Sequence, residues 1–425
     1  MTATIALVAG NIVGSGIFVM PAALAKQTGP LSLIAWPIVA LAYLCLAKIY
    51  TDLASIYPIT GGMQAYVQRA FGDTAGLIAA FMYWVSCVIS NAAFITAFVG
   101  YFQVFVPAVD TPLECFAVAQ CVLWSVTLVN ILGVRAGGAV QTVTVVLKVT
   151  PLLVLAVVML LNADTANLHP FAPHGNGALF PAISLIAWLF LGAESVTVPA
   201  GEIKDAANTI RRAAYIGFGI ACVVYVAVAG GLMLAIPSAE LIDNPSPLAY
   251  AATQLLGPWA GVLISAAALI SILGILNGWL LVTGRLPYSA ATMGVAPAFF
   301  GTLHPRFGTP AVALVFSSGL TAVLALSYFS QTILDAYTRI SLAATNTALV
   351  TVGMTCVAYV VLSRREVAAF TLRQRKLALI YSLVGVAVIV LLMAGSGRLE
   401  LIGTAVCIVL PLPFFYWVRR MRRRG

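Results

Sequence analysis

The sequence predicts an all-α membrane protein with about twelve transmembrane helices, and three observations carry this prediction. Hydrophobic residue types make up 62% of the 425 residues and charged types 8%, whereas a soluble domain carries about 25% charged residues. The mean hydropathy is +1.04. Hydropathy also peaks in stretches of roughly 20 residues, the length that crosses a bilayer. We expect these spans at 3–24, 31–56, 75–104, 112–133, 136–162, 179–199, 211–237, 258–286, 308–328, 331–362, 376–395 and 398–418.

The whole chain, residues 1–425, is expected to form a single transmembrane domain. Only short loops separate the spans, and no long polar or low-complexity segment indicates an appended soluble domain. The first hydrophobic segment lacks a basic stretch before it and an A-x-A cleavage site after it, so we interpret it as a retained span and not as a signal peptide.

The distribution of Lys and Arg predicts the orientation of the chain. Loops on the cytoplasmic side of a membrane protein are enriched in these residues. With an even number of spans both termini share one side, and that side carries most of the positive charge, whereas the opposite loops hold only Lys26 and Arg398. We therefore expect cytoplasmic termini and a location in the cell (inner) membrane. The basic residues assigned to the cytoplasmic side are Arg69, Arg135, Lys204, Arg211, Arg212, Arg285, Arg306, Arg364, Arg365, Arg373, Arg375, Lys376, Arg419, Arg420, Arg422, Arg423 and Arg424.

The first and sixth spans are interrupted by small or polar residues. The first contains Gly14-Ser15-Gly16 and the sixth contains Gly192-Ala193-Glu194-Ser195. Glycine inside a helix costs about 1 kcal/mol relative to alanine. Two breaks five spans apart predict an inverted repeat, 1–162 and 179–362, followed by two extra helices at 376–418. Broken helices in matching positions indicate a transporter site near the bilayer midplane, although small residues also serve helix–helix contacts.

Span 3 carries one polar stripe and span 5 one lysine. Tyr83, Cys87, Asn91 and Phe94 follow a helical spacing, with residue 86 beside them, and share one face. This face suits a small ligand that is part polar and part apolar, or polar contacts between helices. Lys148 lies mid-span; burial favours its neutral form, so it could lose a proton and act as a coupling group, or it extends towards the interface.

Spans 6 and 8 contribute an acid and two tryptophans. Glu194 is the acidic residue predicted to lie deepest in the membrane, where an ionisable group is functional by default. Because burial favours the protonated carboxyl, Glu194 could bind and release a proton, or it is a permanently protonated hydrogen-bonding group. Trp188 and Trp279 also lie centrally. Their rings could bind a cation or serve as a gate, or simply pack.

Other function classes find less support in the residues. The seven cysteines form no C-x-x-C pair, and three scattered histidines supply neither a metal site nor a catalytic constellation. No phosphate-binding loop of the G-x-x-x-x-G-K type is present. We therefore expect no enzyme activity, no cofactor, no metal and no ATP drive. The basic C-terminus is interpreted as an anchor to an anionic leaflet, not as a nucleic-acid site.

Three segments resemble the amino acid–polyamine–organocation superfamily, and the likeness covers nearly the whole chain. GNIVGSGIF is similar to its first-helix substrate loop, GGMQAYVQRAFG to its segment between helices 2 and 3, and GRLPYSAATMG to its segment after helix 8. The chain looks most similar to the basic amino acid and polyamine antiporters. The resemblance implies a LeuT-type 5+5 inverted repeat with 12 transmembrane helices, of which helices 1 and 6 are broken. Members are often homodimers, although the sequence itself carries no sign of one.

The resemblance also implies roles for the residues at these positions. The first break would bind the carboxylate and amine of an amino acid, span 3 would face the substrate, Trp188 would be the middle gate and Trp279 would stack on the distal part. Glu194 matches the acid implicated in proton-dependent cycling. The implied substrate-binding residues are Asn11, Ile12, Gly14, Ser15, Gly16, Tyr83, Ser86, Cys87, Asn91, Phe94, Trp188, Leu191, Gly192 and Trp279.

Among the basic amino acid and polyamine antiporters, the sequence looks similar to the arginine/agmatine type, but two positions depart from that type. Gln64 stands where a gating tyrosine is expected, although Tyr66 is close, and Lys148 stands where that type has a small residue. A lysine there resembles the proton-coupled and exchanger branches, where it replaces a sodium ion.

We expect a secondary active antiporter that exchanges a cationic amino acid for a related amino acid or its decarboxylated amine by alternating access. The alternative is a proton-coupled transporter or exporter of neutral amino acids that uses Lys148. A channel would need a continuous polar pore, whereas the polar residues cluster at one depth; a sensor or scaffold stays open.

Overall fold

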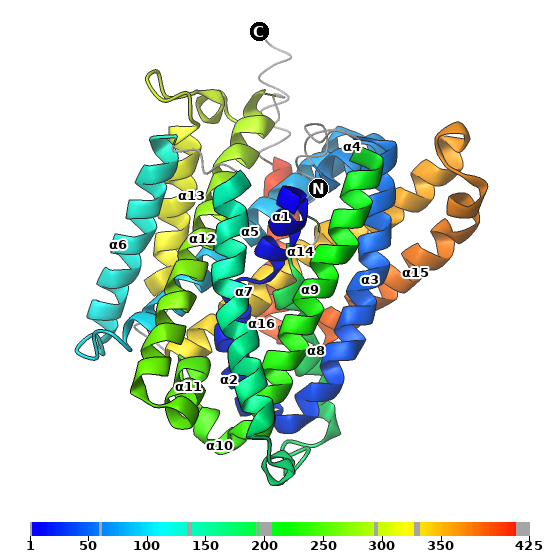
Figure 1. Cartoon of the computed structure of the whole chain (residues 1–425). Helices are drawn as coiled ribbons and strands as arrows, with labels where there is room; N and C mark the ends of the chain where they lie inside the picture. Colours follow the sequence, from blue (N-terminus) through cyan, green and yellow to red (C-terminus); the bar gives the residue numbers. More distant parts are fainter. Residues whose placement is uncertain are drawn as a thin grey trace.

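The computed structural model consists of helices joined by short connections (Figure 1). It describes residues 2–58, 62–133, 138–192, 194, 206–292, 296–326 and 332–413, and within these ranges there is no β-strand. The side chains of residues 2, 3, 6, 7, 138–144, 206 and 207 are not described. The predicted all-α class is therefore confirmed.

The described residues form the following helices, in chain order. The first seven are α1 (Thr2–Ile12), α2 (Gly16–Gln27), α3 (Ser32–Ile56), α4 (Met63–Phe71), α5 (Asp73–Phe102), α6 (Pro112–Ile131) and α7 (Gly138–Leu161). The others are α8 (Leu179–Phe190), α9 (Ala206–Ala235), α10 (Ser238–Leu241), α11 (Pro247–Leu256), α12 (Pro258–Thr292), α13 (Ala311–Leu324), α14 (Ile333–Arg365), α15 (Leu372–Ala394) and α16 (Arg398–Val409).

Seven segments of the described chain are helical, long and apolar enough to cross a membrane. They belong to α3, α5, α6, α9, α12, α14 and α15, and three shorter apolar helices lie in the ranges 145–161, 176–190 and 311–324. The chain is thus a multi-pass membrane protein. The other predicted spans coincide with helices that are interrupted, short or only partly described, so the number twelve stays a prediction.

The interruption in the first span is confirmed. α1 ends at Ile12 and α2 begins at Gly16, so the helix stops for three residues. In the sixth span α8 ends at Phe190, and Gly192 has a φ of 111°, a value that favours glycine. Ala193 and Ser195, which complete the predicted second break, lie outside the described residues.

The broken helices pack among the long ones at the centre of the bundle (Figure 1). α1 packs against α9, α8 packs against α3, and α5 packs against both α12 and α14. Side chains on the inner faces of these helices form one continuous core, whereas α6 and α15 expose wide apolar faces. This arrangement places both helix ends in a buried, apolar environment.

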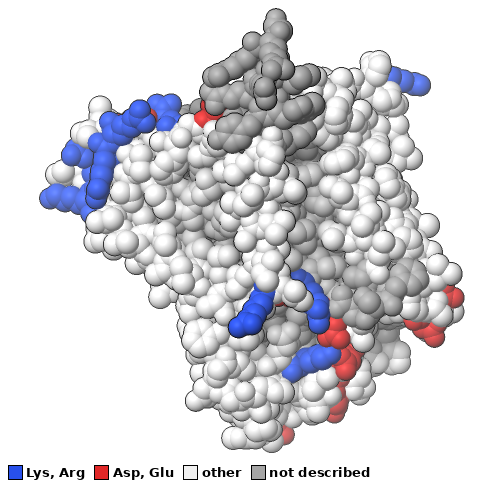
Figure 2. Space-filling view, turned by 180° about the vertical axis from the view of Figure 1, so that it is seen from behind, with Lys and Arg blue, Asp and Glu red and all other residues white. Residues whose placement is uncertain are grey.

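Ion pairs join helices at both ends of the bundle. At one end the Lys26 Nζ donates to Asp243 at 2.6 Å and to Asp335 at 2.9 Å, which links α2, the α10–α11 connection and α14. At the other end Arg69 of α4 donates twice to the carboxylate of Glu366, at 2.9 and 2.8 Å. Figure 2 shows that basic residues also gather at this second end, over the turn between α14 and α15.

Candidate functional site

The first helix break lines a small buried cavity of about 20 Å³. Three further helices line the cavity in addition to the break itself. α5 provides one wall, α8 and the residues that follow it provide a second, and α12 provides a third. The lining residues are Asn11, Ile12, Gly14, Ser15, Gly16, Ser90, Phe94, Trp188, Leu189, Leu191, Ile275 and Trp279.

Side chains of the surrounding helices approach the glycines of the break closely. A Cβ atom on Gly14 would lie 2.3 Å from the Cδ1 of Ile275, and one on Gly16 would lie 2.8 Å from the Cγ of Leu189. Gly192 packs equally closely, because its Cβ would lie 2.7 Å from the carbonyl oxygen of Asn11. The end of α1 therefore packs directly against Gly192, which follows the end of α8.

Aromatic rings form the apolar walls of the site. The ring of Phe94 lies 5.9 Å from that of Trp188 and 6.3 Å from that of Trp279, measured between centroids. Tyr83 lies 6.2 Å from Trp279 in the same way. The indole N–H of Trp188 donates to the hydroxyl of Tyr337 on α14 at 3.0 Å, which fixes the plane of that ring.

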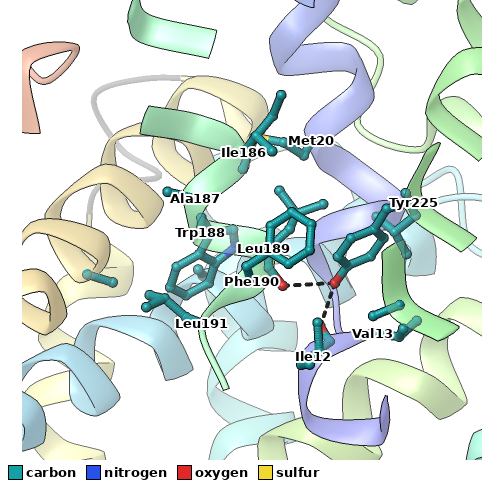
Figure 3. Packing of buried hydrophobic residues seen from close by; sticks show 14 of the residues in the cluster. Ile12, Val13, Met20, Ile186, Ala187, Trp188, Leu189, Phe190, Leu191 and Tyr225 are labelled. Carbon is teal, nitrogen blue, oxygen red and sulfur yellow. Dashed lines mark hydrogen bonds between the residues drawn. The ribbon is translucent and has the colours of Figure 1, made fainter. Parts of the chain in front are cut away.

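Tyr225 of α9 connects the ends of α1 and α8 (Figure 3). Its hydroxyl lies 2.5 Å from the carbonyl oxygen of Ile12 and 2.9 Å from that of Leu189, within hydrogen-bonding distance of both. Carbonyl groups in the last turn of a helix have no partner within the helix. The buried hydroxyl therefore donates where two helices would each leave an acceptor unsatisfied.

Lys148 of α7 also contacts the end of α1. Its Nζ donates to the carbonyl oxygen of Gly10 at 2.6 Å, and the residue is 3% exposed. The side chain therefore lies inside the bundle and does not extend towards the interface. A lysine ammonium and a tyrosine hydroxyl together satisfy carbonyl groups at positions 10 and 12 of the first broken helix.

Glu194 lies beside the second interruption and contacts span 3. The residue is 2% exposed. Its carboxylate accepts the backbone N–H of Gly192, whose nitrogen lies 3.1 and 3.0 Å from the two oxygens, and the hydroxyl of Tyr83 at 3.3 Å. Protonation or deprotonation of Glu194 would therefore change contacts with both the break and α5.

The structure brings most of the predicted substrate-binding residues together, although span 3 contributes less than the sequence indicated. Only Phe94 of its polar stripe lines the cavity. Ser86 instead donates to the carbonyl of Ala344 at 2.8 Å, and Cys87 is buried. Asn91 is 0% exposed, and its amide has no hydrogen-bond partner within the described residues.

Sequence reasoning missed Ser90, Leu189 and Ile275 in the cavity wall and Tyr225 behind it. None of these residues interrupts a span or departs from ordinary membrane composition. Ser90 precedes the predicted Asn91 by one position, and a one-residue shift turns a helical side chain by about 100°. Tyr225 carried no signal that distinguished it from other tyrosines.

The donor set of the site suits a small organic ligand better than a metal ion. Within the described part of the chain no group of three or more His, Cys, Asp or Glu residues could hold a metal. The site instead offers backbone groups at two helix ends, one carboxyl, one ammonium and several aromatic rings. Such a combination can recognise both ends of an amino acid, with backbone for the charged groups and rings for the side chain.

Comparison with known proteins gives a consistent assignment. The family model for amino acid permeases matches residues 1–415. A cadaverine/lysine antiporter of Escherichia coli is 27% identical over 98% of this chain and 94% of its own length. A putative arginine/ornithine antiporter of Bacillus subtilis is 29% identical over 80% of this chain and 79% of its own length. An arginine/ornithine antiporter of Pseudomonas aeruginosa is 29% identical over 81% and 75%.

Proposed function

The chain belongs to the amino acid permease family, and from that premise we propose that it is an antiporter that exchanges a cationic amino acid for a related amino acid or its decarboxylated amine. The observation that carries the proposal is that the break between α1 and α2 and the end of α8 meet at one buried cavity between Trp188 and Trp279. The activities for which the three relatives are named concern lysine, arginine, ornithine or cadaverine, and they agree with it.

We infer an inverted repeat of the LeuT type with twelve transmembrane helices, and helix contacts support it. In such a repeat α1, α3, α5, α6 and α7 would correspond in order to α8, α9, α12, α13 and α14. A two-fold axis that exchanges the two repeats would then convert a contact between two helices into a contact between their counterparts. The pair α1–α9 would become α8–α3, the pair α5–α14 would become α12–α7, and the pair α6–α12 would become α13–α5. All six pairs are in contact. Residues 1–162 and 179–362 would form the repeats, with 376–418 outside them.

The helix ends account for recognition of the part that all amino acids share. The N–H groups at the start of α2, at Gly16, favour a carboxylate, whereas the carbonyl groups at the end of α1, at Asn11 and Ile12, favour an ammonium. Ser15 lines the same cavity, and Asn91 is buried on α5 one residue after Ser90, which also lines it. Leu191 and Gly192 would close this end of the site.

The aromatic residues would recognise the distal part of the substrate. A cation over the face of a tryptophan, tyrosine or phenylalanine gains about 0.5–2 kcal/mol, with the larger value when water is excluded. Phe94, Trp188 and Trp279 line the cavity, and Tyr83 lies against Trp279. Stacking on these rings also permits a range of chain lengths, because it does not demand one fixed hydrogen-bonding position.

Coupling to protons is assigned to Glu194 and Lys148. Glu194 contacts the second interruption through Gly192, and Lys148 contacts the first through the Gly10 carbonyl. Each group can gain or lose one proton, and each holds a segment that would move during alternating access. Loss of the Lys148 proton would weaken its charge-assisted hydrogen bond to α1.

The proposed location is the cell membrane, with both termini in the cytoplasm. The start of α1, helix α4 and the basic turn between α14 and α15 lie at one end of the bundle (Figure 1). Lys and Arg predominate there, as expected of the cytoplasmic side. The function requires no cofactor, and the partners are the small-molecule substrates and lipid; a homodimer remains an expectation from the family resemblance.

Proteoliposomes test the proposed activity. Vesicles loaded with unlabelled lysine, arginine, ornithine, putrescine or cadaverine should take up labelled lysine or arginine, whereas vesicles without internal substrate should take up much less. Trp279→Ala should weaken uptake, and Trp259→Ala, on an exposed position of the same helix, should not. If only alanine or methionine is exchanged, the cationic assignment is wrong and the neutral transporter is correct.

A further inference from the structure

A second, larger cavity opens at the end of the bundle where α14 meets α15. Its volume is about 370 Å³, and it is lined by Ser363, Arg364, Val367, Leu372, Arg375 and Lys376. It shares no lining residue with the substrate site. Figure 2 shows basic side chains gathered over this turn. Three of the six lining residues are cationic and two are apolar, which is an unusual combination for a simple solvated turn.

No acidic side chain in the described part of the chain forms an ion pair with the basic residues of this cavity, Arg364, Arg375 and Lys376. The segment 363–376 contains one acidic residue, Glu366, and Arg69 already binds its carboxylate with two hydrogen bonds. The pKa of Glu366 is lowered by that hydrogen bond from Arg69, which is the behaviour of a carboxylate committed to another partner.

The basic residues at the start of α15 also favour a bound anion. Residues 373, 375 and 376 lie in the first turns of this helix, and no acidic residue lies in its first turn. The N-terminus of a helix carries a partial positive charge, so Lys and Arg are disfavoured there. Arg364, at the end of α14, is by contrast placed favourably. An anion bound between the end of α14 and the start of α15 would offset the unfavourable interaction of residues 373, 375 and 376 with the positive end of α15.

The position of the cavity relative to the membrane indicates which anion it binds. α15 continues from Leu377 to Ala394 as an apolar helix, a length of about 27 Å, which nearly matches the hydrocarbon thickness of about 30 Å. The basic residues therefore lie at the level of lipid headgroups. Val367 is 46% and Leu372 is 63% exposed beside them, and these side chains offer an apolar surface to an acyl chain. We propose that this cavity binds the phosphate headgroup of an anionic phospholipid.

Short-chain lipids test the site on the purified full chain in detergent. Dioctanoyl phosphatidylglycerol should raise the melting temperature in a saturable way, and dioctanoyl phosphatidylcholine and inorganic phosphate should not. In the triple variant Arg364→Gln/Arg375→Gln/Lys376→Gln, the apparent Kd for phosphatidylglycerol should rise at least tenfold. Arg211→Gln/Arg212→Gln/Arg306→Gln removes the same charge at exposed positions elsewhere and should retain the wild-type Kd.

Each alternative outcome overturns the proposal. An equal shift with inorganic phosphate would identify a soluble anion as the ligand, and equal loss in both triple variants would reduce the effect to net charge. Absence of any shift with phosphatidylglycerol would reject the site. Should the first triple variant fail to fold, Lys376→Gln alone should raise the Kd, and Val367→Ser/Leu372→Ser should weaken binding without any change of charge.

Discussion

At the scale of single residues, Tyr225 is the side chain with the most consequential contacts outside the cavity wall. It belongs to α9, yet its hydroxyl lies against carbonyl groups of α1 and α8 (Figure 3). A hydroxyl has one hydrogen to donate, so the two carbonyl groups share it. Any movement that separates the two interrupted helices must therefore leave one of these carbonyl groups with a different partner.

We predict that Tyr225→Phe impairs both stability and exchange. Loss of the hydroxyl leaves two buried carbonyl groups without their donor, and an unsatisfied buried acceptor costs about 1–3 kcal/mol. The melting temperature should fall, and the rate of lysine or arginine exchange should fall about tenfold. Tyr250→Phe is the control, because its hydroxyl binds Glu240 at an exposed position. Normal melting and exchange in Tyr225→Phe would contradict the assigned contact.

Glu194→Gln should separate proton coupling from binding. The glutamine oxygen can still accept the N–H of Gly192, so the second interruption keeps one of its contacts, but the side chain no longer binds and releases a proton. Exchange measured in proteoliposomes between pH 5 and pH 8 should therefore lose most of its pH dependence. Glu240→Gln, at an exposed position, should behave as wild type. An unchanged pH profile in Glu194→Gln would exclude Glu194 as the coupling group.

At the scale of elements, the two interrupted helices depend on each other's backbone. Gly192 follows α8 with a φ of 111°, and its Cα faces the carbonyl of Asn11 near the end of α1. A Cβ atom at position 192 would lie only 2.7 Å from that oxygen. Gly192 therefore allows α1 to approach more closely than any other residue would. Backbone packing, and not a side-chain contact, sets this distance.

Gly192→Ala should therefore disrupt the site more than an ordinary glycine substitution. A non-glycine residue at this φ is strained by about 1–3 kcal/mol, and the Asn11 oxygen must also shift. We expect at least a tenfold loss of exchange and a lower melting temperature. Gly219→Ala is the matched control, because a Cβ there meets nothing within 4 Å on helix α9, where alanine is favoured. Equal effects of the two substitutions would argue against the close approach.

At the scale of the whole molecule, ion pairs link helices that are distant in sequence at both ends of the bundle. Lys26 joins α2 to the α10–α11 connection and to α14. Arg69 and Tyr57 join α4 and the end of α3 to Glu366 after α14. α14 thus takes part in both links, one at each end, and alternating access would require the links to open in turn.

The link at Glu366 should make stability depend on pH in a defined direction. The hydrogen bond from Arg69 lowers the pKa of Glu366 below its usual value of 4.5. The stabilisation is therefore complete above pH 4.5 and is lost as pH falls through the lowered pKa. Because the side chains of Arg69 and Glu366 are 48% and 28% exposed, the contribution is at most about 1 kcal/mol.

Melting curves of wild type and Glu366→Gln should differ by about 2 °C at pH 7 and by less at pH 4. Arg69→Gln should produce a similar loss, and the double variant should lose little more than either single variant, because both remove one interaction. A difference that grows on acidification would show that the pKa of Glu366 is not lowered.

Much of the fold follows from sequence because the bilayer imposes simple requirements. A span must be long and apolar, so hydropathy located α3, α5, α9, α12, α14 and α15 within a few residues. The two glycines at positions 14 and 16 marked the first interruption, because glycine weakens a helix that the surrounding apolar residues would otherwise continue. The short helices α4, α10 and α11 lie outside such constraints, and their boundaries were not predicted.

The site was harder to predict because it depends on distances across helices. The stripe from Tyr83 to Phe94 extends for about 16 Å along α5, far more than a cavity of about 20 Å³ can contact, and so only Phe94 reaches it. Ile275 and Tyr225 contribute through the packing of α12 and α9, which no local pattern encodes. The roles of the predicted residues in binding and coupling stay predictions.

The size of the central cavity has a consequence for how affinity should be understood. A space of about 20 Å³ accommodates roughly one water molecule, and an amino acid enters only if the surrounding rings and helix ends separate. Binding and expansion are then one thermodynamic event, and a measured Kd reports the contact free energy minus the work of expansion. Two substrates of equal contact energy would differ in affinity through their volume alone, so side-chain bulk becomes a determinant of selectivity in its own right.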